Sequence, residues 1–313
     1  MEFVIINSIN TNLVKGGILR MNETAFVKPL LDRLVEKAQN GDGTYYKITL
    51  VENGVSQTAV VTPANGAQNS YSIAKVFTVT AIGMLVDRNL LQTDERVCDI
   101  LRDQLPPDVD PAWEEMTVHH LLTHSAGFAG GYLDIDAANH VPIAGDDYLG
   151  YLLHTKLQYT PGTQSRYSDA AYYLLSRIFT AKCGEKMDDY LLQHLFYPLE
   201  FREMAWSKCP MGYPMGATGL YVYTEDLAKL GALYLNGGVY GAKQILSRNW
   251  VETVLREGYE FAKTPGGGYG KGGMYGQMLI FYPGQNRVVA YHSYNGADLV
   301  GYLDSIATKP CPQ

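Results

Sequence analysis

Hydrophobic residues recur at two different spacings along this chain, and each spacing predicts a different kind of element. Thr24–Gln39 carries them at helical spacing and ends in a glycine-rich turn, which predicts a surface helix. Tyr45–Val51 and Val55–Val61 are rich in β-branched and aromatic residues and are joined by Asn53-Gly54, so they predict a β-hairpin. Ser72 to about Leu90 is apolar nearly all round, which predicts a buried central helix.

The hydrophobic pattern in the middle of the chain predicts helices. From Asp94 to Tyr197 the pattern is helical with long connections and no convincing strand, and its clearest helices are Ala170–Cys183 and Met187–Leu195. Glycine and proline then become frequent after Trp206. A further helix is predicted at Thr224–Asn236, with two acidic residues in its first turn.

The last part of the chain returns to strands. After a short helix at Trp250–Arg256, the glycine-dense stretch Gly266–Gly273 predicts a loop. Met274–Tyr282 and Arg287–Tyr291 alternate as strands around a turn, and a short helix near 298–308 ends the chain.

Strands therefore fall at both ends of the chain and helices fall between them. The fold class this predicts is α/β (α+β), with one antiparallel sheet built from N- and C-terminal strands, flanked by helices, plus an inserted all-helical lobe. Residues 1–313 would form a single domain, with an α/β lobe at 1–82 and 210–313 and a helical lobe at 83–209. The cleft between two such lobes is a natural binding site.

Composition narrows the function classes. The chain has 313 residues, 46% hydrophobic and 18% charged, as in ordinary globular proteins, and its net charge of −7 comes without any basic block. We therefore expect no nucleic acid and no membrane surface as a partner. The start of the chain lacks a basic segment followed by a long apolar run, and no apolar run reaches membrane-spanning length, so the pattern predicts a cytoplasmic protein.

Ser72-Ile73-Ala74-Lys75 opens the predicted central helix and is the strongest candidate for chemistry. A serine hydroxyl needs a neighbouring base to act as a nucleophile at neutral pH. Residues three apart share a helix face, so the Lys75 amine can reach back to Ser72, and the helix N-terminus favours developing negative charge. The structural alternative is that Ser72 only helps to cap a buried helix while Lys75 reaches solvent.

Two further segments follow in order. The first is Pro161-Gly162-Thr163-x-x-x-Tyr167-Ser168-Asp169, and the second is Lys271-Gly272-Gly273. Taken with Ser72-x-x-Lys75, they resemble the serine β-lactamase and penicillin-binding-protein-like superfamily. The resemblance is greatest to its branch of class C β-lactamases, D-Ala-D-Ala carboxypeptidases, family VIII esterases and 6-aminohexanoate-dimer hydrolase. Met116–Gly127 and Gly219–Ala228 resemble signatures of that branch outside its active site.

The resemblance implies a mechanism. Ser72 would attack a carbonyl and form an acyl-enzyme, with Lys75 and Tyr167 sharing the work of the general base. Burial and a nearby cation such as Lys271 would depress the pKa of Lys75 and favour its basic form. The charge of Lys75 would in turn lower the pKa of Tyr167, so the two groups would titrate together. The alternative for Tyr167 is a packed aromatic residue ahead of a helix.

The chain also departs from the family pattern. Asp169 stands where the family has asparagine, so it would either hold Lys75 protonated, leaving more of the base role to Tyr167, or only cap the helix that follows. Gly272 replaces the family's threonine and removes a hydroxyl that would grip a substrate carboxylate. The Met274 N–H, paired with that of Ser72, would form the oxyanion hole beside Lys271 and Gly273.

Other patterns are weaker. Gly268-x-Gly270-x-x-Gly273 fits a dinucleotide fingerprint by letters, but a strand follows it instead of a helix. Ser125 has Thr123 and not glycine two residues before it, so it does not fit a nucleophile elbow. The histidines at 119, 120 and 124 have no acidic partner at metalloprotease spacing, so they are interpreted as structural. The scattered cysteines also lack zinc-site spacing. We predict no metal and no cofactor.

The sequence thus predicts a β-lactamase-related serine hydrolase whose substrate is a small-molecule ester, amide or lactam, with ester hydrolysis favoured. D-amino-acid peptidase or β-lactamase activity is one alternative. A non-catalytic ligand-binding relative is another, because Asp169 and Gly272 depart from the family pattern.

Overall fold

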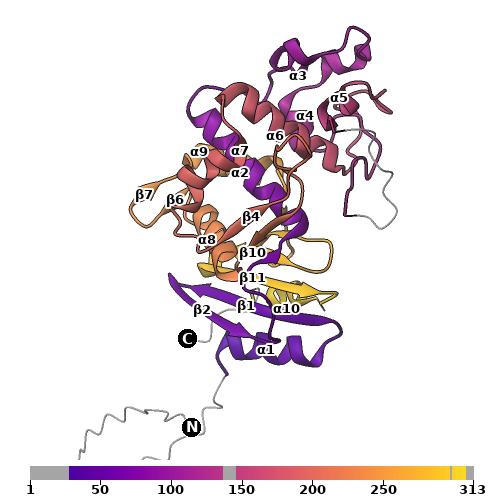
Figure 1. Cartoon of the computed structure of the whole chain (residues 1–313). Coiled ribbons are helices and arrows are strands. Elements are labelled where there is room, and N and C mark those ends of the chain that lie inside the picture. Colours follow the sequence, from indigo (N-terminus) through magenta and orange to yellow (C-terminus); the bar gives the residue numbers. More distant parts are fainter. Residues whose placement is uncertain (1–27, 137–145, 297, 308–313) are drawn as a thin grey trace, which may run out of the picture.

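The protein is built on a six-stranded antiparallel sheet whose strand order is β2-β1-β11-β10-β9-β8 (Figure 1). The computed structural model describes residues 28–136, 146–296 and 298–307. The strands of this sheet are β1 Thr44–Glu52, β2 Val55–Val60, β8 Ala262–Lys263, β9 Tyr269–Gly272, β10 Met278–Tyr282 and β11 Arg287–Tyr294. The first and last long strands lie side by side, with Thr44 opposite Tyr294 and Glu52 opposite Arg287. The predicted joining of N- and C-terminal strands in one antiparallel sheet is confirmed.

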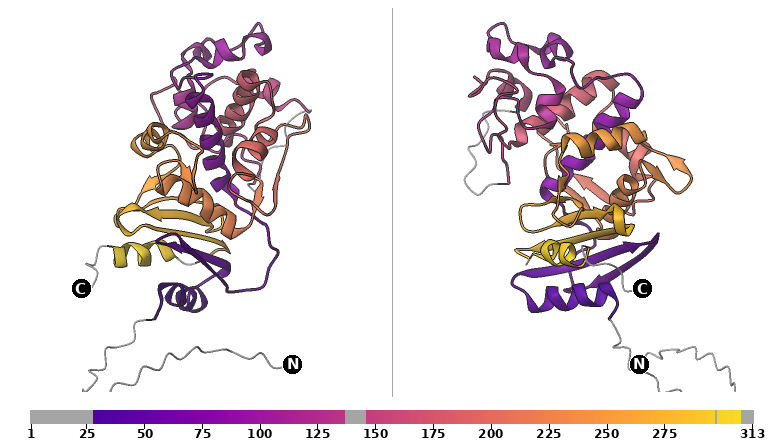
Figure 2. Two further views of the ribbon diagram at one scale, coloured as in Figure 1. Left: turned by 90° about the vertical axis from the view of Figure 1, so that its left-hand side faces the viewer. Right: turned by 180° about the vertical axis from the view of Figure 1, so that it is seen from behind.

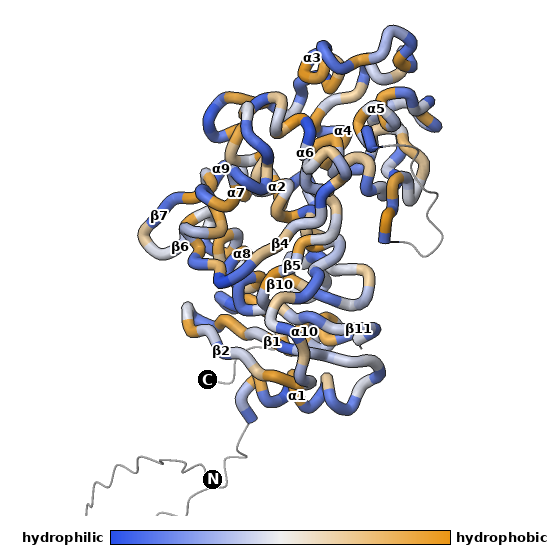
Figure 3. Tube along the Cα trace, viewed as in Figure 1, coloured by the Kyte–Doolittle hydropathy of each residue, from blue (hydrophilic) through white to orange (hydrophobic). Residues whose placement is uncertain are grey.

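Helices cover both faces of the sheet (Figures 1 and 2). On one face lie α1 (Leu30–Asn40) and α10 (Leu299–Ala307), and on the other lies α8 (Thr224–Leu235). The hydrophobic residues of α1 that face the sheet are Leu30, Leu34 and Ala38, spaced one helical turn apart, while hydrophilic residues alternate with them along the helix (Figure 3). This spacing is the reason that the segment is helical and lies at the surface.

Helix α2 (Ala74–Asp87) runs through the middle of the molecule and carries Ser72 just before its first residue (Figure 1). Twelve of its fourteen residues are buried, from Ala74 to Leu85, which matches the sequence prediction of a helix apolar on all sides. It packs against α6 (Asp169–Cys183), and these two helices bring Lys75 and Asp169 together.

The remaining helices of the helical part are α3 (Val97–Ile100), α4 (Val118–Leu122), α5 (Tyr148–Leu153) and α7 (Met187–Leu191), and the last continues into a π-helical turn at Leu192–Phe196. Among the described residues between 94 and 197 there is no strand, as predicted. No helix in the described ranges is long and apolar enough to cross a membrane.

Several short elements carry too little periodicity to be found from sequence. A small sheet joins β3 (Gln68–Asn69), β5 (Leu220–Val222) and β4 (Met204–Trp206), and a hairpin joins β6 (Val239–Tyr240) to β7 (Lys243–Gln244). Strands of two or three residues offer no alternation to recognise. The β3–β5 pair nonetheless matters, because it fixes the segment that leads into Ser72.

Three predicted boundaries were wrong. Residues 269–272, expected in a loop, form β9, because pairing with β10 outweighs the poor strand propensity of glycine. The strand expected from Met274 begins at Met278, and residues 274–276 form a turn instead. The first helix begins at Leu30, after Pro29, and the earlier part of its predicted range, 24–27, lies outside the described residues.

Candidate active site

Ser72 lies in a single 3₁₀ turn, Tyr71–Ile73, directly before α2. Its Oγ accepts a hydrogen bond from the Lys75 Nζ at 3.2 Å, so the predicted pair is in contact. The preceding residue, Tyr71, has a left-handed backbone with φ of 47°, and its N–H is held by the Asn69 Oδ1 at 2.9 Å. This conformation is costly for a bulky residue, and strain of this kind is concentrated at functional sites.

Lys75 is completely buried. Its Nζ donates to three acceptors: the Ser72 Oγ at 3.2 Å, the Asp169 Oδ1 at 2.7 Å and the Ala217 carbonyl at 3.0 Å. A lysine ammonium has three hydrogens to donate, so this geometry satisfies the protonated amine completely. Of the two alternatives for Asp169, the contact supports an ion pair with Lys75.

The expected depression of the Lys75 pKa is therefore wrong. Burial on its own lowers the pKa of Lys75, but the Asp169 carboxylate raises it, with smaller contributions from Tyr167 and Glu260, and the net direction is upward. Burial also raises the pKa of Asp169, and the Lys75 ammonium opposes that rise. The ion pair favours the charged form of Lys75, which donates a hydrogen bond to the Ser72 Oγ.

Tyr167 faces both site lysines. Its hydroxyl accepts a hydrogen bond from the Lys271 Nζ at 3.3 Å, and its ring centroid lies 4.6 Å from the Lys75 Nζ and 4.8 Å from the Lys271 Nζ. Its side chain remains 45% exposed, so it can meet a substrate.

The end of β9 approaches the nucleophile segment closely. A side chain at Gly273 would meet the backbone oxygen of Ser70 at 2.8 Å, so only glycine fits there. The next residue, Met274, is 46% exposed and lies in the turn after β9. Among the described residues, neither its N–H nor that of Ser72 has a hydrogen-bond acceptor, which leaves both groups available to a ligand.

The structure adds a residue pair that sequence reasoning missed. The Glu260 side chain is 2% exposed and connects two groups: it forms an ion pair with Lys271, and its Oε1 lies 2.8 Å from the His124 Nε2. Burial on its own would raise the pKa of Glu260, but Lys271 and His124 hold it below its ordinary value. Both His124 and Glu260 have left-handed backbones, with φ of 56° and 67°.

His124 also holds the segment that carries Tyr167. Its carbonyl accepts from the Arg166 N–H at 2.7 Å, its Nδ1 accepts from the Ser168 N–H at 3.3 Å, and its ring lies 4.4 Å from that of Tyr167. Because Nδ1 accepts, Nε2 carries the hydrogen that it donates to Glu260. His124 belongs to the Met116–Gly127 signature, which was the available signal. Glu260 is 136 residues away in sequence and stands in no motif.

Three carboxylates lie together beside Lys75. Asp134, Asp136 and Asp169 each place an oxygen within 4.8 Å of the others, a spacing that could hold a cation. Asp169 is already bonded to the Lys75 ammonium, and Asp136 accepts from the Thr218 hydroxyl. Burial raises the pKa of Asp136, as does the nearby Asp169. The Lys75 ammonium thus provides positive charge beside the three carboxylates.

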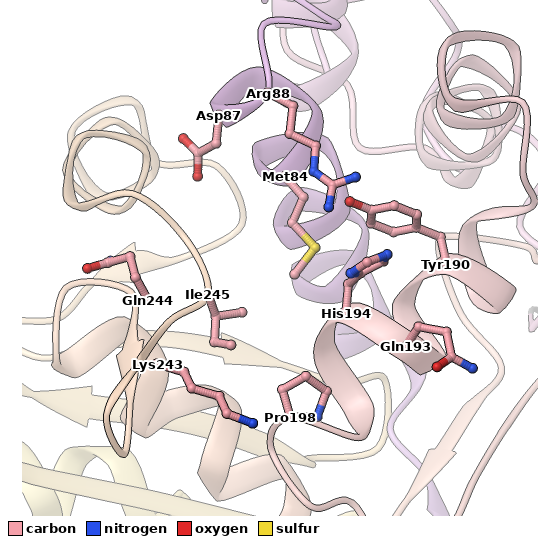
Figure 4. A pocket seen from close by; sticks show the side chains of 10 residues that line it. All are labelled: Met84, Asp87, Arg88, Tyr190, Gln193, His194, Pro198, Lys243, Gln244 and Ile245. Atoms are coloured by element: carbon pink, nitrogen blue, oxygen red, sulfur yellow. The ribbon is translucent and has the colours of Figure 1, made fainter.

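A separate hollow of about 450 Å³ lies at the other end of α2 (Figure 4). Its walls include Met84 from the last turn of α2 and Arg88 directly after it, with Tyr190 and His194 beside them and Lys243 from the β6–β7 hairpin (Figure 4). None of the predicted site residues lines it. The predicted pair Ser72 and Lys75 lies instead at the N-terminal end of α2.

Comparisons with known proteins identify the family of the chain. The profile of the β-lactamase family matches residues 59–298. "Penicillin-binding protein 4" of Amycolatopsis lactamdurans is 30% identical over 178 residues, which cover 56% of this chain and 43% of that protein. The "Putative D-alanyl-D-alanine carboxypeptidase" of Escherichia coli K12 is 26% identical over 218 residues, which cover 61% and 48%. The matched regions thus span less than half of these two relatives.

Solved structures share the fold. The "Putative 6-aminohexanoate-dimer hydrolase from Bacillus anthracis" superposes with a TM-score of 0.70 at 18% identity, covering 89% of this chain and 80% of the other. The predicted β-lactamase-like fold is confirmed. With the family profile matching most of its length, the chain belongs to the β-lactamase family, within the superfamily of serine β-lactamases and penicillin-binding proteins.

Proposed function

We propose that this chain is a serine hydrolase that forms an acyl-enzyme on Ser72 and acts on small esters. The observation that carries the proposal is the contact between the Ser72 Oγ and the fully buried Lys75 Nζ at 3.2 Å, opposite the exposed Tyr167. A nucleophile, a proton acceptor and free N–H donors at one place are the parts that acyl transfer requires.

Each residue has a distinct part in this proposal. Tyr167 acts as the phenolate: the Ser72 Oγ bonds to the substrate carbonyl carbon while its proton passes to the ionised Tyr167 oxygen, and the N–H groups of Ser72 and Met274 stabilise the oxyanion. The same proton then goes to the departing alcohol as its bond to the acyl carbon breaks. In the second half, water attacks the acyl-enzyme and gives a proton to Tyr167, which returns it to Ser72.

Uncharged esters fit this site better than substrates with a carboxylate next to the scissile bond. Lys271, the first residue of the third motif, is already paired with Glu260, and Gly272 offers no hydroxyl. Asp134 and Asp136 add negative charge nearby. The relatives named as a penicillin-binding protein and a carboxypeptidase make a D-peptide or β-lactam substrate the second candidate.

Labelling with a fluorophosphonate tests the nucleophile. We expect a single adduct by intact mass, mapped to the peptide that contains Ser72 and absent in Ser72→Ala. Ser125→Ala is the matched control, because the Ser125 hydroxyl bonds that of Thr123 and none of the site side chains, and this variant should label like the wild type. No adduct, under conditions in which a known serine hydrolase reacts, would favour a ligand-binding protein without turnover.

Tyr167→Phe tests the proton acceptor. Because the same oxygen serves both half-reactions, we expect roughly 10²–10⁴-fold slower acylation and a comparably slower deacylation. Pre-steady-state and steady-state release of nitrophenol from nitrophenyl acetate separates the two rates. If only KM changes, Tyr167 is a binding residue and not the proton acceptor. The control is Tyr197→Phe, which changes an exposed tyrosine outside the site and should leave both rates unchanged.

A further inference from the structure

A pocket of about 280 Å³ adjoins the Ser72 segment and is separate from the hollow of Figure 4. Tyr71, which immediately precedes Ser72, lines it, and so does Gln277. Gln277 supports the end of β9, because its carbonyl accepts from the Gly273 N–H at 2.8 Å and its Oε1 accepts from the Tyr275 N–H at 3.1 Å. The pocket therefore borders both segments that would form the oxyanion hole.

The lining of this pocket carries no formal charge. It contains no aspartate, glutamate, lysine or arginine, and its one histidine, His292, is 1% exposed. Burial lowers the pKa of His292 to about 3, with Lys47 adding to the effect, so the imidazole is neutral at physiological pH. A charged ligand group would lose its hydration here without gaining a partner of opposite charge.

The same lining holds hydrogen-bonding groups that have no use within the protein. The His292 Nδ1 lies 2.8 Å from the Thr224 hydroxyl, but its buried Nε2 has no partner among the described residues. The hydroxyls of the four lining tyrosines likewise make no hydrogen bond within the described chain, and these residues are Tyr46, Tyr71, Tyr221 and Tyr294. The His292 nitrogen is covered by protein, whereas Tyr221 and Tyr294 are exposed, so their hydroxyls can exchange water for the polar groups of a ligand.

Aromatic rings form the wall of the pocket on the Ser72 side. The Tyr71 ring meets that of Tyr275 edge-on at 5.0 Å, and Tyr275 stacks on Tyr294 at 4.9 Å. The left-handed backbone of Tyr71 sets its place in this cluster. Tyr221 and Tyr294 remain 41% and 51% exposed at the rim. Tyrosine rings offer apolar faces and polar tips, which suits a ligand with both kinds of surface.

We propose that this tyrosine pocket is a subsite for one side of the substrate's scissile bond and binds an uncharged group rich in hydroxyl and amide functions, of the glycosyl class. The proposal rests on the proposed function, since a subsite requires acylation of Ser72. Sugar rings present hydroxyls for the tyrosine hydroxyls of the lining, and C–H faces for the tyrosine rings. The volume matches a single ring of this kind.

Matched esters test the subsite. We would compare kcat/KM for an acetylated methyl glucoside and for cyclohexylmethyl acetate, which has a similar ring and no hydroxyls. The wild-type kcat/KM should be about tenfold or more higher for the sugar ester. The double variant Tyr221→Phe, Tyr294→Phe should lose most of this difference through a higher KM for the sugar ester, because each lost hydrogen bond weakens binding by roughly a factor of 2–10. Tyr197→Phe is the control and should keep the preference.

The outcomes separate the two proposals. If kcat/KM for the sugar ester is no greater than that for the cyclohexylmethyl ester, while nitrophenyl acetate is still hydrolysed through Ser72, the subsite proposal is wrong and the hydrolase proposal stands. The subsite proposal is also wrong if the double variant keeps the wild-type ratio of the two kcat/KM values. Failure of every ester, together with no labelling of Ser72, overturns the hydrolase and with it the subsite as defined here. Titration of methyl glucoside into the Ser72→Ala protein would then decide whether the pocket binds sugars in a protein without turnover.

Discussion

Replacing Lys75 with alanine is expected to slow acylation of Ser72 by roughly 10³-fold and to destabilise the fold. The buried amine orients the Ser72 hydroxyl and places positive charge beside the Tyr167 ring, and alanine removes both effects. It also leaves Asp169, with a side chain only 5% exposed, without its ion-pair partner. Losing one partner of a buried pair costs about 3–5 kcal/mol. Stopped-flow acylation and denaturant unfolding measure the two effects.

Matched variants separate chemistry from folding in this experiment. Lys75→Met combined with Asp169→Asn removes both charges and fills similar space, so it should recover much of the lost stability while acylation stays slow. Lys182→Ala removes a lysine of a partly exposed ion pair with Glu95 and should change neither quantity much. If Lys75→Ala, shown to be folded, keeps more than a tenth of the wild-type acylation rate, Lys75 has no part in the chemistry.

The sequence predicted the parts of the fold whose periodicity is long. The hairpin around Asn53-Gly54, the all-apolar helix after Ser72 and the pairing of the chain's two ends were each visible as extended patterns. The glycine-rich strand β9 was not, because its stability comes from hydrogen bonds to β10 and not from its own side chains. The turn at 274–276 was missed for a related reason, since Met274 continues the apolar pattern of the strand that begins at Met278.

Some features of the candidate site could likewise be predicted from sequence motifs, and others could not. Ser72 and Lys75 are local neighbours, and motif order linked them to Tyr167 and Lys271, all of which the structure brings together. The charge state of Lys75 could not be read from those motifs, because it depends on a balance between burial and the Asp169 carboxylate across two helices. Glu260 was not visible at all, since only the folded chain brings it to His124 and Lys271.

A continuous chain of polar contacts surrounds the proposed base. Lys271 donates a hydrogen bond to the Tyr167 hydroxyl and forms an ion pair with Glu260, which is bonded to the His124 side chain. His124 in turn accepts hydrogen bonds from the backbone N–H groups on either side of Tyr167. Fixing a group from two directions lowers the number of positions that it can adopt before reaction. Glu260 and His124 are thus positioning residues, acting on the site through Lys271 and Tyr167.

Glu260→Gln tests this chain of contacts. Glutamine keeps the size of the side chain but removes the charge that holds Lys271, so we expect a roughly 10²-fold loss that lies in kcat more than in KM, as for a misplaced catalytic group. Glu257→Gln is the matched control, because it removes an equal charge three positions away at the surface, and it should stay near wild type. Equal activity of the two variants would remove Glu260 from the catalytic account.

The pH dependence of stability distinguishes the charge of Glu260 from its shape. The native protein holds the pKa of Glu260 below its ordinary value, so the unfolded chain takes up the proton first as the pH falls. The stabilisation from this charge is therefore complete above the unfolded pKa of about 4.5 and disappears at lower pH. The free energy of unfolding of Glu260→Gln should lie below that of the wild type at pH about 7, and the gap should narrow below pH about 4.5. A gap that does not change with pH would mean that packing, and not charge, is what Glu260 contributes.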